Sequence, residues 1–306
     1  MNTHAATPER IELREGILVH PKDDVAFVMT PEGGVAAVDL ATGVPRWTTQ
    51  KAAKPLLLVG NRLLCQVQPA TAAQRDDLLL AVLDVGYRGK VIARAALDLP
   101  DEIVTAVTET PFGHFVLDAR SAGTESVKVA WKFAASGKRG TPPRPEQEET
   151  AAARPLAAIR EFLGSLRINL ATGTLEHVQE TETSAPSALD SLVDGSDTDE
   201  QPGTQYRSAD GRMLVTSERI ADDREWNNYR WTVMDTANGE QLGEIRTYVA
   251  FAPFVVRRGV LVMETKPYIR GGAMQPAMLR GYDLATGNEQ WTFAVREIVF
   301  RGPTPP

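Results

Sequence analysis

The residue types that most often perform chemistry are few in this chain and widely separated. The chain has four histidines, His4, His20, His114 and His177. Their spacing fits no metal-binding pattern. The one cysteine, Cys65, lies in the apolar run 63–67, which predicts a small buried hydrophobic side chain and not a nucleophile. The sequence also contains no nucleophile elbow, no zinc-protease motif and no phosphate- or dinucleotide-binding loop. We therefore expect no catalytic residue and no metal site.

One acidic segment is a candidate for binding a cation. Residues 180–203 are polar and acidic, and residues 194–200 resemble a calcium-binding loop in composition. The glycine of this stretch is misplaced for an EF-hand, and no flanking helices are evident. The composition favours a flexible, solvated loop, with calcium binding as the alternative.

Composition and charge exclude several classes of protein. The chain has 306 residues, of which 42% are hydrophobic, as in an ordinary globular protein. Lys and Arg total 33 and Asp and Glu total 40, so the net charge is −7. An acidic chain lacks the positive charge that nucleic-acid binding requires. The sequence thus favours no nucleic-acid partner.

The location of the protein is predicted from the same features. The first ten residues show no basic start followed by an apolar stretch, so no export signal is visible. The longest apolar runs, 55–59 and 78–83, are far shorter than the ~20 residues that span a bilayer. We expect a cytoplasmic protein without a membrane span, or a periplasmic one if a leader was removed.

A short repeat is the most informative feature of the sequence. Residues 38–47 and 282–291 share Asp-Leu-Ala-Thr-Gly, with Trp four residues after the Gly. Weaker copies occupy residues 169–173, 235–239 and 83–89. The repeated residues are Asp39, Thr42, Gly43, Trp47, Gly173, Asp235, Gly239, Asp283, Thr286, Gly287 and Trp291. A repeat of this kind indicates an architecture built from several similar units.

Each copy has the chemistry of a tight turn between two strands. Asp and Thr side chains can bind nearby backbone groups, and Gly accepts a positive φ. Strand-forming residues precede and follow each copy, as in 34–39 and 45–49. The motif therefore predicts a β-hairpin, and its Gly is structural and not phosphate-binding.

The strand pattern predicts an all-β fold. Two further strand candidates precede each hairpin, which gives four antiparallel strands per unit, the signature of a β-propeller blade. The predicted units are 11–50, 54–98, 101–180, 203–247 and 249–295. Five blades are expected, with six or seven as alternatives. Residues 296–301 and 11–19 compete for an edge position in the first blade.

The third unit is too long for one blade and predicts an insertion. Residues 136–163 begin as a Pro-rich loop, and 151–163 carry apolar residues at helical spacing after Pro155. A short helix that covers the third blade is expected here. A helix that binds a partner is the alternative.

Aromatic residues in two loops suggest an interaction surface. Trp226 and Tyr229 interrupt the fourth unit, and Tyr268 and Arg270 interrupt the fifth at an equivalent place. Such aromatic residues often anchor protein interfaces. Packing against a neighbouring blade is the alternative for Trp226 and Tyr229.

The pattern Ala-x-Asp-x-x-Thr-Gly-x-x-x-Trp at residues 37–47, with a close second copy at 282–291, resembles the blade motif of the PQQ-like (quinoprotein-like) β-propeller repeat family. The resemblance covers most of the chain as an architecture, related to WD40 and YVTN propellers. It implies that Trp47 and Trp291 pack between neighbouring blades. It also raises PQQ with calcium as a cofactor, but no motif here supports that site, and one cysteine cannot form the disulfide of the family's alcohol dehydrogenases.

These features favour the non-enzymatic branch of the family. We expect a monomeric, bacterial-type propeller that acts as a scaffold and binds a protein partner through loops on one face. The alternatives are a propeller that binds a small molecule or quinone, including an oxidoreductase, and an envelope assembly factor if a leader was removed. If both Trp rings are buried between blades, Trp47→Ala and Trp291→Ala should each destabilise the protein by roughly 3–5 kcal/mol.

Overall fold

The computed structural model describes most of the strand-forming parts of the chain. The described residues are 11–13, 16–67, 78–97, 101, 114–134, 161–177, 205–208, 210–220, 228–270 and 273–296. The secondary-structure elements within these residues are β-strands, and the strands pair with one another in antiparallel fashion.

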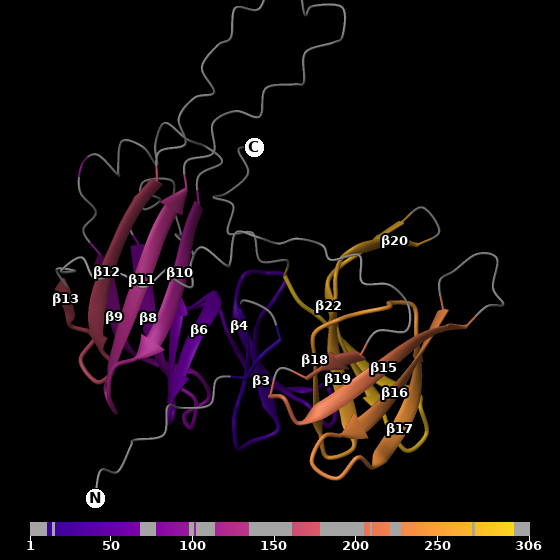
Figure 1. Cartoon of the computed structure of the whole chain (residues 1–306). Coiled ribbons are helices and arrows are strands. Elements are labelled where there is room, and N and C mark those ends of the chain that lie inside the picture. The colour runs from indigo at the N-terminus through magenta and orange to yellow at the C-terminus, as the bar shows by residue number, and fades with distance from the viewer. Residues whose placement is uncertain are drawn as a thin grey trace, which may run out of the picture. The chain divides into compact units, whose positions relative to one another are not determined.

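The strands form five consecutive sheets, which we call blades 1 to 5 (Figure 1). Blade 1 contains β1 (Ile11–Glu12), β2 (Ile17–Val19), β3 (Val25–Met29), β4 (Val35–Asp39) and β5 (Pro45–Thr49). Blade 2 contains β6 (Lys54–Val59), β7 (Arg62–Gln66), β8 (Leu78–Asp84) and β9 (Lys90–Leu97). Blade 3 contains β10 (His114–Ser121), β11 (Ser126–Ala134), β12 (Glu161–Asn169) and β13 (Leu175–His177).

The last two blades follow the same plan. Blade 4 contains β14 (Gln205–Arg207), β15 (Met213–Ile220), β16 (Asn228–Asp235) and β17 (Gln241–Thr247). Blade 5 contains β18 (Phe254–Arg257), β19 (Val260–Thr265), β22 (Met278–Asp283) and β23 (Glu289–Ala294). A separate hairpin of β20 (Tyr268–Arg270) and β21 (Ala273–Gln275) lies between β19 and β22 in the chain. The predicted all-β fold with five four-stranded propeller blades is confirmed, and blade 1 carries β1 as an additional strand.

The chain divides into two compact units. The first comprises residues 1–68, 81–93 and 195–298, and the second comprises residues 69–80, 94–194 and 299–306. Blades 1, 4 and 5 and most of blade 2 belong to the first unit, and blade 3 belongs to the second.

The core of the first unit consists of layers between neighbouring blades. Side chains alternate along each strand, so Phe27 on β3 packs toward blade 2 and Val28 packs toward blade 5. One layer joins blades 1 and 2, a second joins blades 1 and 5, and a third joins blades 4 and 5. The first and last blades of the chain therefore share a core. Because the sheets are buried on both faces, their strands read as nearly continuous apolar runs.

Cys65 belongs to the layer between blades 1 and 2 and is fully buried. Burial raises the pKa of its thiol. Its position agrees with the expected small hydrophobic side chain.

In the second unit, blade 3 buries one face of its sheet. The buried residues there include Leu117, Val129, Trp131 and Leu166. Gly164 on β12 leaves room for the Trp131 ring, since a Cβ at Gly164 would overlap that ring. The Trp131 ring occupies the space that a side chain at Gly164 would fill, so β11 and β12 can pair at this position without a clash.

The structure corrects the predicted helix in the third unit. The predicted helix over 151–163 does not include residues 161–163, because they form the start of β12 and pair with β11. Strand pairing there overrides the local helical spacing. Residues 151–160, the rest of the predicted insertion and the acidic loop 180–203 lie outside the described residues.

The edge position in blade 1 is occupied by the N-terminal candidate. Strands β1 and β2 fall within residues 11–19 and pair with each other and with β3. The competing segment 297–301 lies outside the described residues, and only Arg296 is seen to donate a backbone hydrogen bond to Met29, at 3.0 Å. Among the described residues, no helix has the length and apolar character needed to cross a bilayer.

Candidate functional site

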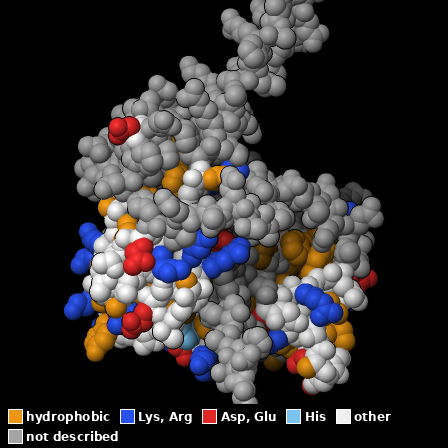
Figure 2. Space-filling view, turned by 60° about the vertical axis from the view of Figure 1, so that its left-hand side comes forward, with side chains coloured by type: hydrophobic (Ala, Val, Ile, Leu, Met, Phe, Trp, Pro, Cys, Tyr) orange, Lys and Arg blue, Asp and Glu red, His pale blue; other side chains and the backbone are white. Residues whose placement is uncertain are grey.

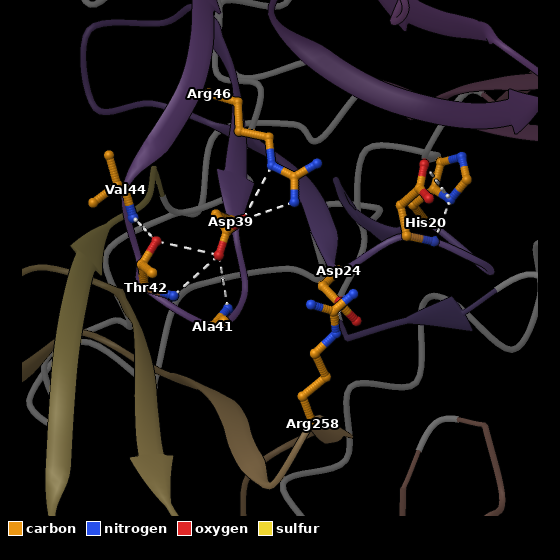
Figure 3. A network of polar contacts seen from close by, with 9 residues as sticks. His20, Asp24, Asp39, Ala41, Thr42, Val44, Arg46 and Arg258 are labelled. Atoms are coloured by element: carbon orange, nitrogen blue, oxygen red, sulfur yellow. Dashed lines mark hydrogen bonds and ion pairs between the residues drawn. The ribbon is translucent and has the colours of Figure 1, made fainter.

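The repeated motif forms the same hydrogen-bonded turn in several blades. In blade 1 the Asp39 carboxylate accepts hydrogen bonds from the backbone of Ala41 and Thr42 and from the Thr42 hydroxyl (Figure 3). Gly43 has a φ of 70° and donates to the Asp39 carbonyl at 2.8 Å. This positive φ explains the glycine, because other residues rarely adopt it.

The other copies reproduce this turn with small changes. Asp283 binds the backbone of Ala285 and Thr286, and Asn169 binds the backbone of Ala171 and Thr172 through its amide oxygen. Asp235 accepts from Ala237 at 2.7 Å. All four glycines of these turns have a positive φ. The repeated Asp, Thr and Gly residues are therefore occupied in turns.

A further contact ties each turn to the rest of its blade. The residue after the Asp donates a backbone hydrogen bond to an earlier turn of the same blade. Leu40 donates in this way to Asp24, between β2 and β3, at 3.0 Å. Leu284 donates to Gly259 at 2.9 Å and Leu170 to Glu125 at 2.8 Å in the same way. This shared contact fixes both hairpins at one end of the blade.

Substitutions of Asp39 test how much the turn contributes to stability. Desolvation raises the pKa of its carboxyl group, but the hydrogen bonds from Arg46, Thr42 and Ala41 outweigh it, so the pKa lies below its ordinary value. We expect Asp39→Ala to lower the free energy of unfolding by about 2 kcal/mol, because several hydrogen bonds are lost. Asp39→Asn should cost at most ~1 kcal/mol, because Asn169 forms the same turn in blade 3. Urea unfolding of both variants measures the difference, and equal losses would contradict it.

The tryptophan of the motif docks on the turn of the neighbouring blade. A Cβ placed on Gly43 would lie 2.5 Å from the Trp291 ring, and a Cβ on Gly89 would lie 2.5 Å from the Trp47 ring. Blade 5 thus docks on blade 1, and blade 1 docks on blade 2. Trp291 is 9% exposed and Trp47 is half-buried. Both rings lie between blades, as the resemblance implied.

The junction between blades 4 and 5 departs from this rule. Trp47 pairs with Ala37, Trp291 pairs with Gly281, and the same register in blade 4 pairs Gly243 with Val233. In all three hairpins an irregularity follows at the next position. Blade 4 therefore has a glycine where the other two blades have the docking tryptophan.

Blade 5 compensates for the missing ring from its own side. A Cβ on Gly243 would overlap the carbonyl of Leu284, and one on Gly287 would lie 2.6 Å from the carbonyl of Glu244. The two backbones thus meet directly. By register, Tyr282 takes the position of Val38, and Arg280 that of Ala36. A tyrosine and an arginine on β22 replace the apolar pair of blade 1.

One turn connects blade 5 to both of its neighbours through ion pairs. Arg257 pairs with Asp210 of blade 4 at 3.0 Å, and Arg258 pairs with Asp24 of blade 1 at 2.5 Å (Figure 3 shows the second pair). The side chain of Asp210 is 1% exposed and that of Arg257 13%, whereas that of Arg258 is 77% exposed. The first pair is therefore buried and the second lies at the surface.

His20 accepts hydrogen bonds in a tight turn. Its Nδ1 accepts from the backbone N–H of Asp23 at 2.8 Å, so Nδ1 cannot carry a proton there (Figure 3). Burial lowers the pKa of this imidazole and outweighs the nearby Asp23 carboxylate, which raises it. A histidine that is neutral in the folded protein binds a proton more readily in the unfolded chain.

This asymmetry predicts a loss of stability in mild acid. Because the unfolded state takes up the proton first, the free energy of unfolding should fall as pH decreases below about 6.5. In His20→Asn the amide oxygen can replace Nδ1 as the acceptor, and the pH dependence between about 7.5 and 5 should weaken. Urea midpoints at both pH values measure this. An unchanged pH dependence in the variant would exclude His20 as its source.

The four residues of the expected interaction surface are not found together. Tyr229 is 8% exposed and belongs to the core layer between blades 4 and 5, which corrects its assignment to the surface and agrees with the packing alternative. It faces inward because alternation on β16 puts it beside Trp231 and Val233. Tyr268 and Arg270 lie on β20, and Trp226 lies outside the described residues.

A large open groove lies at the outer strands of blades 4 and 5. Its volume is about 1230 Å³. One wall consists of Gln241 and residues 243–248 on and after β17, with Asn228 and Arg230 on β16. The other wall consists of Arg280, Tyr282, Leu284, residues 285–288 and Glu289. The motif did not point to this groove, but one signal was available, since the sequence has no Trp four residues after Gly239.

The groove is polar and contains an arginine that is paired with a glutamate. Arg280 donates to the Glu289 carboxylate at 2.6 Å and lies 5.2 Å from the centre of the Tyr248 ring. Burial lowers the pKa of its guanidinium, but the bond to Glu289 outweighs burial, so the pKa lies above its ordinary value. Burial raises the pKa of Tyr282. Arg280 and Tyr282 therefore stay protonated at neutral pH.

No metal centre is evident in the part of the chain that the structure describes. Groups of three or more His, Cys, Asp or Glu side chains arranged to hold an ion are absent there. The expected absence of a cofactor, PQQ with calcium included, stays a prediction. On the face shown in Figure 2, Lys and Arg side chains gather in a row with Asp and Glu side chains among them, so the net charge of −7 is not spread uniformly.

Comparisons with known proteins found matches among solved structures only. No protein-family model and no curated protein matches the chain. A Dos1 propeller structure is 12% identical with a TM-score of 0.27, over 91% of this chain and 57% of its own. The apo AtxE2 isopeptidase is 12% identical with a TM-score of 0.40, over 98% and 52%. The Cps50 (Swd1) propeller domain of Myceliophteria thermophila is 9% identical with a TM-score of 0.27, over 93% and 88%.

The chain spans little more than half the length of the first two structures that it resembles. Two of these structures are propellers by their descriptions. The PQQ-like assignment stays a prediction. At these TM-scores the likeness says nothing of function, which has to be argued from the residues themselves.

Proposed function

We propose that this protein is a non-catalytic β-propeller scaffold that binds a protein partner through the loops on one face. The observation that carries the proposal is the position of the long connections. The second and third strands are joined by residues 67–77 in blade 2, 135–160 in blade 3, 221–227 in blade 4 and 266–277 in blade 5. Because the strands are antiparallel, the strand ends that these connections join lie at the end of each blade opposite the Asp-Thr-Gly turns.

The two ends of a blade therefore have different roles. The turn end is used by short hairpins, backbone contacts between hairpins and the ion pairs of Arg257 and Arg258. The loop end carries segments of variable length, such as the β20–β21 hairpin of blade 5. Binding residues occur most often on loops that a rigid scaffold positions. This division supports a partner-binding role for the loop end.

Native mass spectrometry of the protein isolated gently from its own cells tests the proposal. A second polypeptide in fixed stoichiometry is the expected result. A retained small molecule, together with turnover that depends on residues of the described blades, would overturn the proposal in favour of a ligand-binding or oxidoreductase propeller. A control isolation after deletion of 267–276 should lose the partner if the loop end binds it.

A further inference from the structure

We propose that the groove between blades 4 and 5 binds an extended acidic segment of a protein partner, which lies along the free edge of β17. This inference rests on the proposed function, because it assigns a second contact site to the scaffold and names the chemistry of the segment that binds there. The site lies on the outer strands of the blades and differs from the loop end.

The groove follows the edge of one strand. Gln241 and every residue from 243 to 248 line it. Ile245 and Thr247 pair with Trp231 and Tyr229 on one face of the sheet, and Glu244 and Arg246 lie on the opposite face. Since residues of both faces line the same groove, the groove runs along the strand edge and not over a face.

The edge itself is available for pairing. β17 is the last strand in the order β14-β15-β16-β17, and no described strand pairs with its outer side. Such an edge presents unpaired N–H and C=O groups that can bind another extended chain. β17 has 7 residues, which corresponds to about 24 Å of extended backbone. An added strand of similar length fits this edge.

At Gly243 the start of β17 lies directly against blade 5. At the junctions of blades 5 and 1 and of blades 1 and 2, a tryptophan ring covers the corresponding position. At Gly243 there is no side chain, and the backbone of β17 lies against Leu284. This contact closes the junction at Gly243, so the segment would lie along the part of β17 that follows Gly243.

Charge selects the chemistry of the segment. The lining has three arginines, Arg230, Arg246 and Arg280, and two glutamates, Glu244 and Glu289, so its charge is 3 − 2 = +1 in a chain of −7. Arg280 is neutralised by Glu289. The excess of +1 is therefore the sum of Arg230, Arg246 and Glu244.

These two arginines form an unfavourable pair that an acidic side chain would relieve. Arg230 and Arg246 stand directly opposite each other on β16 and β17. Like charges in this position destabilise a sheet. Arg230 has a weak ion pair with Glu218 at 4.0 Å, and Arg246 has none among the described residues. An Asp or Glu of a bound segment placed beside Arg246 would relieve this repulsion.

The test uses a fluorescein-labelled decapeptide of alternating Glu and Thr with capped ends, and the full-length protein at low salt. We expect the peptide to bind the unmodified protein in an anisotropy titration, and the matching Lys-Thr peptide not to bind. Arg246→Glu should weaken binding about tenfold or more. The matched control is Arg219→Glu, which makes the same charge change at an exposed position of β15 outside the groove and should change the affinity less than about twofold.

Hydrogen exchange distinguishes strand addition from simple charge attraction. A peptide added to the edge should slow the exchange of backbone amides within 241–247, and charge attraction alone should not. Equal binding of the Lys-Thr peptide, equal losses in Arg246→Glu and Arg219→Glu, or unchanged exchange in β17 would each overturn the inference.

The failure of this inference can be told apart from the failure of the proposed function. If a partner copurifies equally well with Arg246→Glu and with the unmodified protein, the scaffold function stands and the groove is not its site. If no partner copurifies and a ligand with turnover is found, the scaffold function itself fails.

Discussion

Trp291→Ala is expected to lower the free energy of unfolding by about 3–5 kcal/mol. The ring is 9% exposed and lies in the core layer between blades 1 and 5. It covers Gly43 of the neighbouring turn and Gly281 of its own blade, and a Cβ at either glycine would overlap it. Removing the ring leaves a cavity that neither backbone can fill. Chemical denaturation followed by circular dichroism measures the loss.

Two further variants assign the loss to the contact between blades. Trp291→Phe keeps an aromatic ring on Gly43 and should cost clearly less than Trp291→Ala. Gly43→Ala should destabilise the native protein through a φ of 70° and through overlap with the ring. In the Trp291→Ala background the overlap is gone, so Gly43→Ala should cost less there. Additive effects of the two changes would contradict the docking contact.

Trp47→Ala should also lower the free energy of unfolding, but by less than Trp291→Ala. Trp47 docks on Gly89 in the same way, but its ring is only half-buried. Folding removes less of its apolar surface from water than it does for Trp291, so truncation costs less free energy of unfolding. The sequence-based expectation of equal effects is therefore revised in favour of Trp291.

Asp210→Asn is expected to cost about 3–5 kcal/mol, because it leaves Arg257 with its charge buried and unmatched. Asp210 is 1% exposed and holds Arg257 at 3.0 Å across the junction of blades 4 and 5. It also accepts from the Ser208 hydroxyl and from the backbone N–H of Arg212. The matched control is Asp24→Asn, which breaks the pair with the 77% exposed Arg258 and should cost only about 0–1 kcal/mol.

The pH dependence of the Asp210 effect follows from its ionisation. Desolvation raises the pKa of this carboxyl group, but the hydrogen bonds from Ser208, Arg212 and Arg257 outweigh it, so its pKa lies below the ordinary value. A lowered pKa gives stability that is complete above the unfolded value near 3.9 and is lost as the folded carboxylate becomes protonated. The difference between the native protein and Asp210→Asn should therefore be constant near neutral pH and shrink below about pH 4. A difference that grows in acid would contradict this assignment.

Local chemistry made much of the fold predictable. The Asp-x-x-Thr-Gly turns specify their own hydrogen bonds and a positive φ at Gly43, and they recur at intervals that mark the blades. All five predicted units correspond to the five blades, because turn residues and apolar runs are short-range signals. The failures have the same origin. Residues 161–163 follow a helical pattern and still form β12, because pairing with β11 decides their conformation.

The candidate groove could not be found in this way. It depends on Gly243, Tyr282 and Arg280, which come from two blades and are brought together only by packing. Tyr229 is a second residue whose position the local sequence did not predict. An aromatic residue next to a polar loop suggested a surface, and strand alternation on β16 put it in the core instead.

From its residues alone, this chain is all-β, built of five repeated four-stranded units and held by Asp-Thr-Gly turns, because each of these properties depends on neighbours a few residues apart. Tertiary structure decided which side chains meet across blades. It joined Trp291 to Gly43, Arg257 to Asp210 and Arg258 to Asp24, and it formed a groove between blades 4 and 5, where Gly243 meets the backbone of Leu284 in place of a docking tryptophan. Such contacts join residues far apart in the chain, so no local pattern encodes them, and they set both the stability of the blade junctions and the surface offered to a partner.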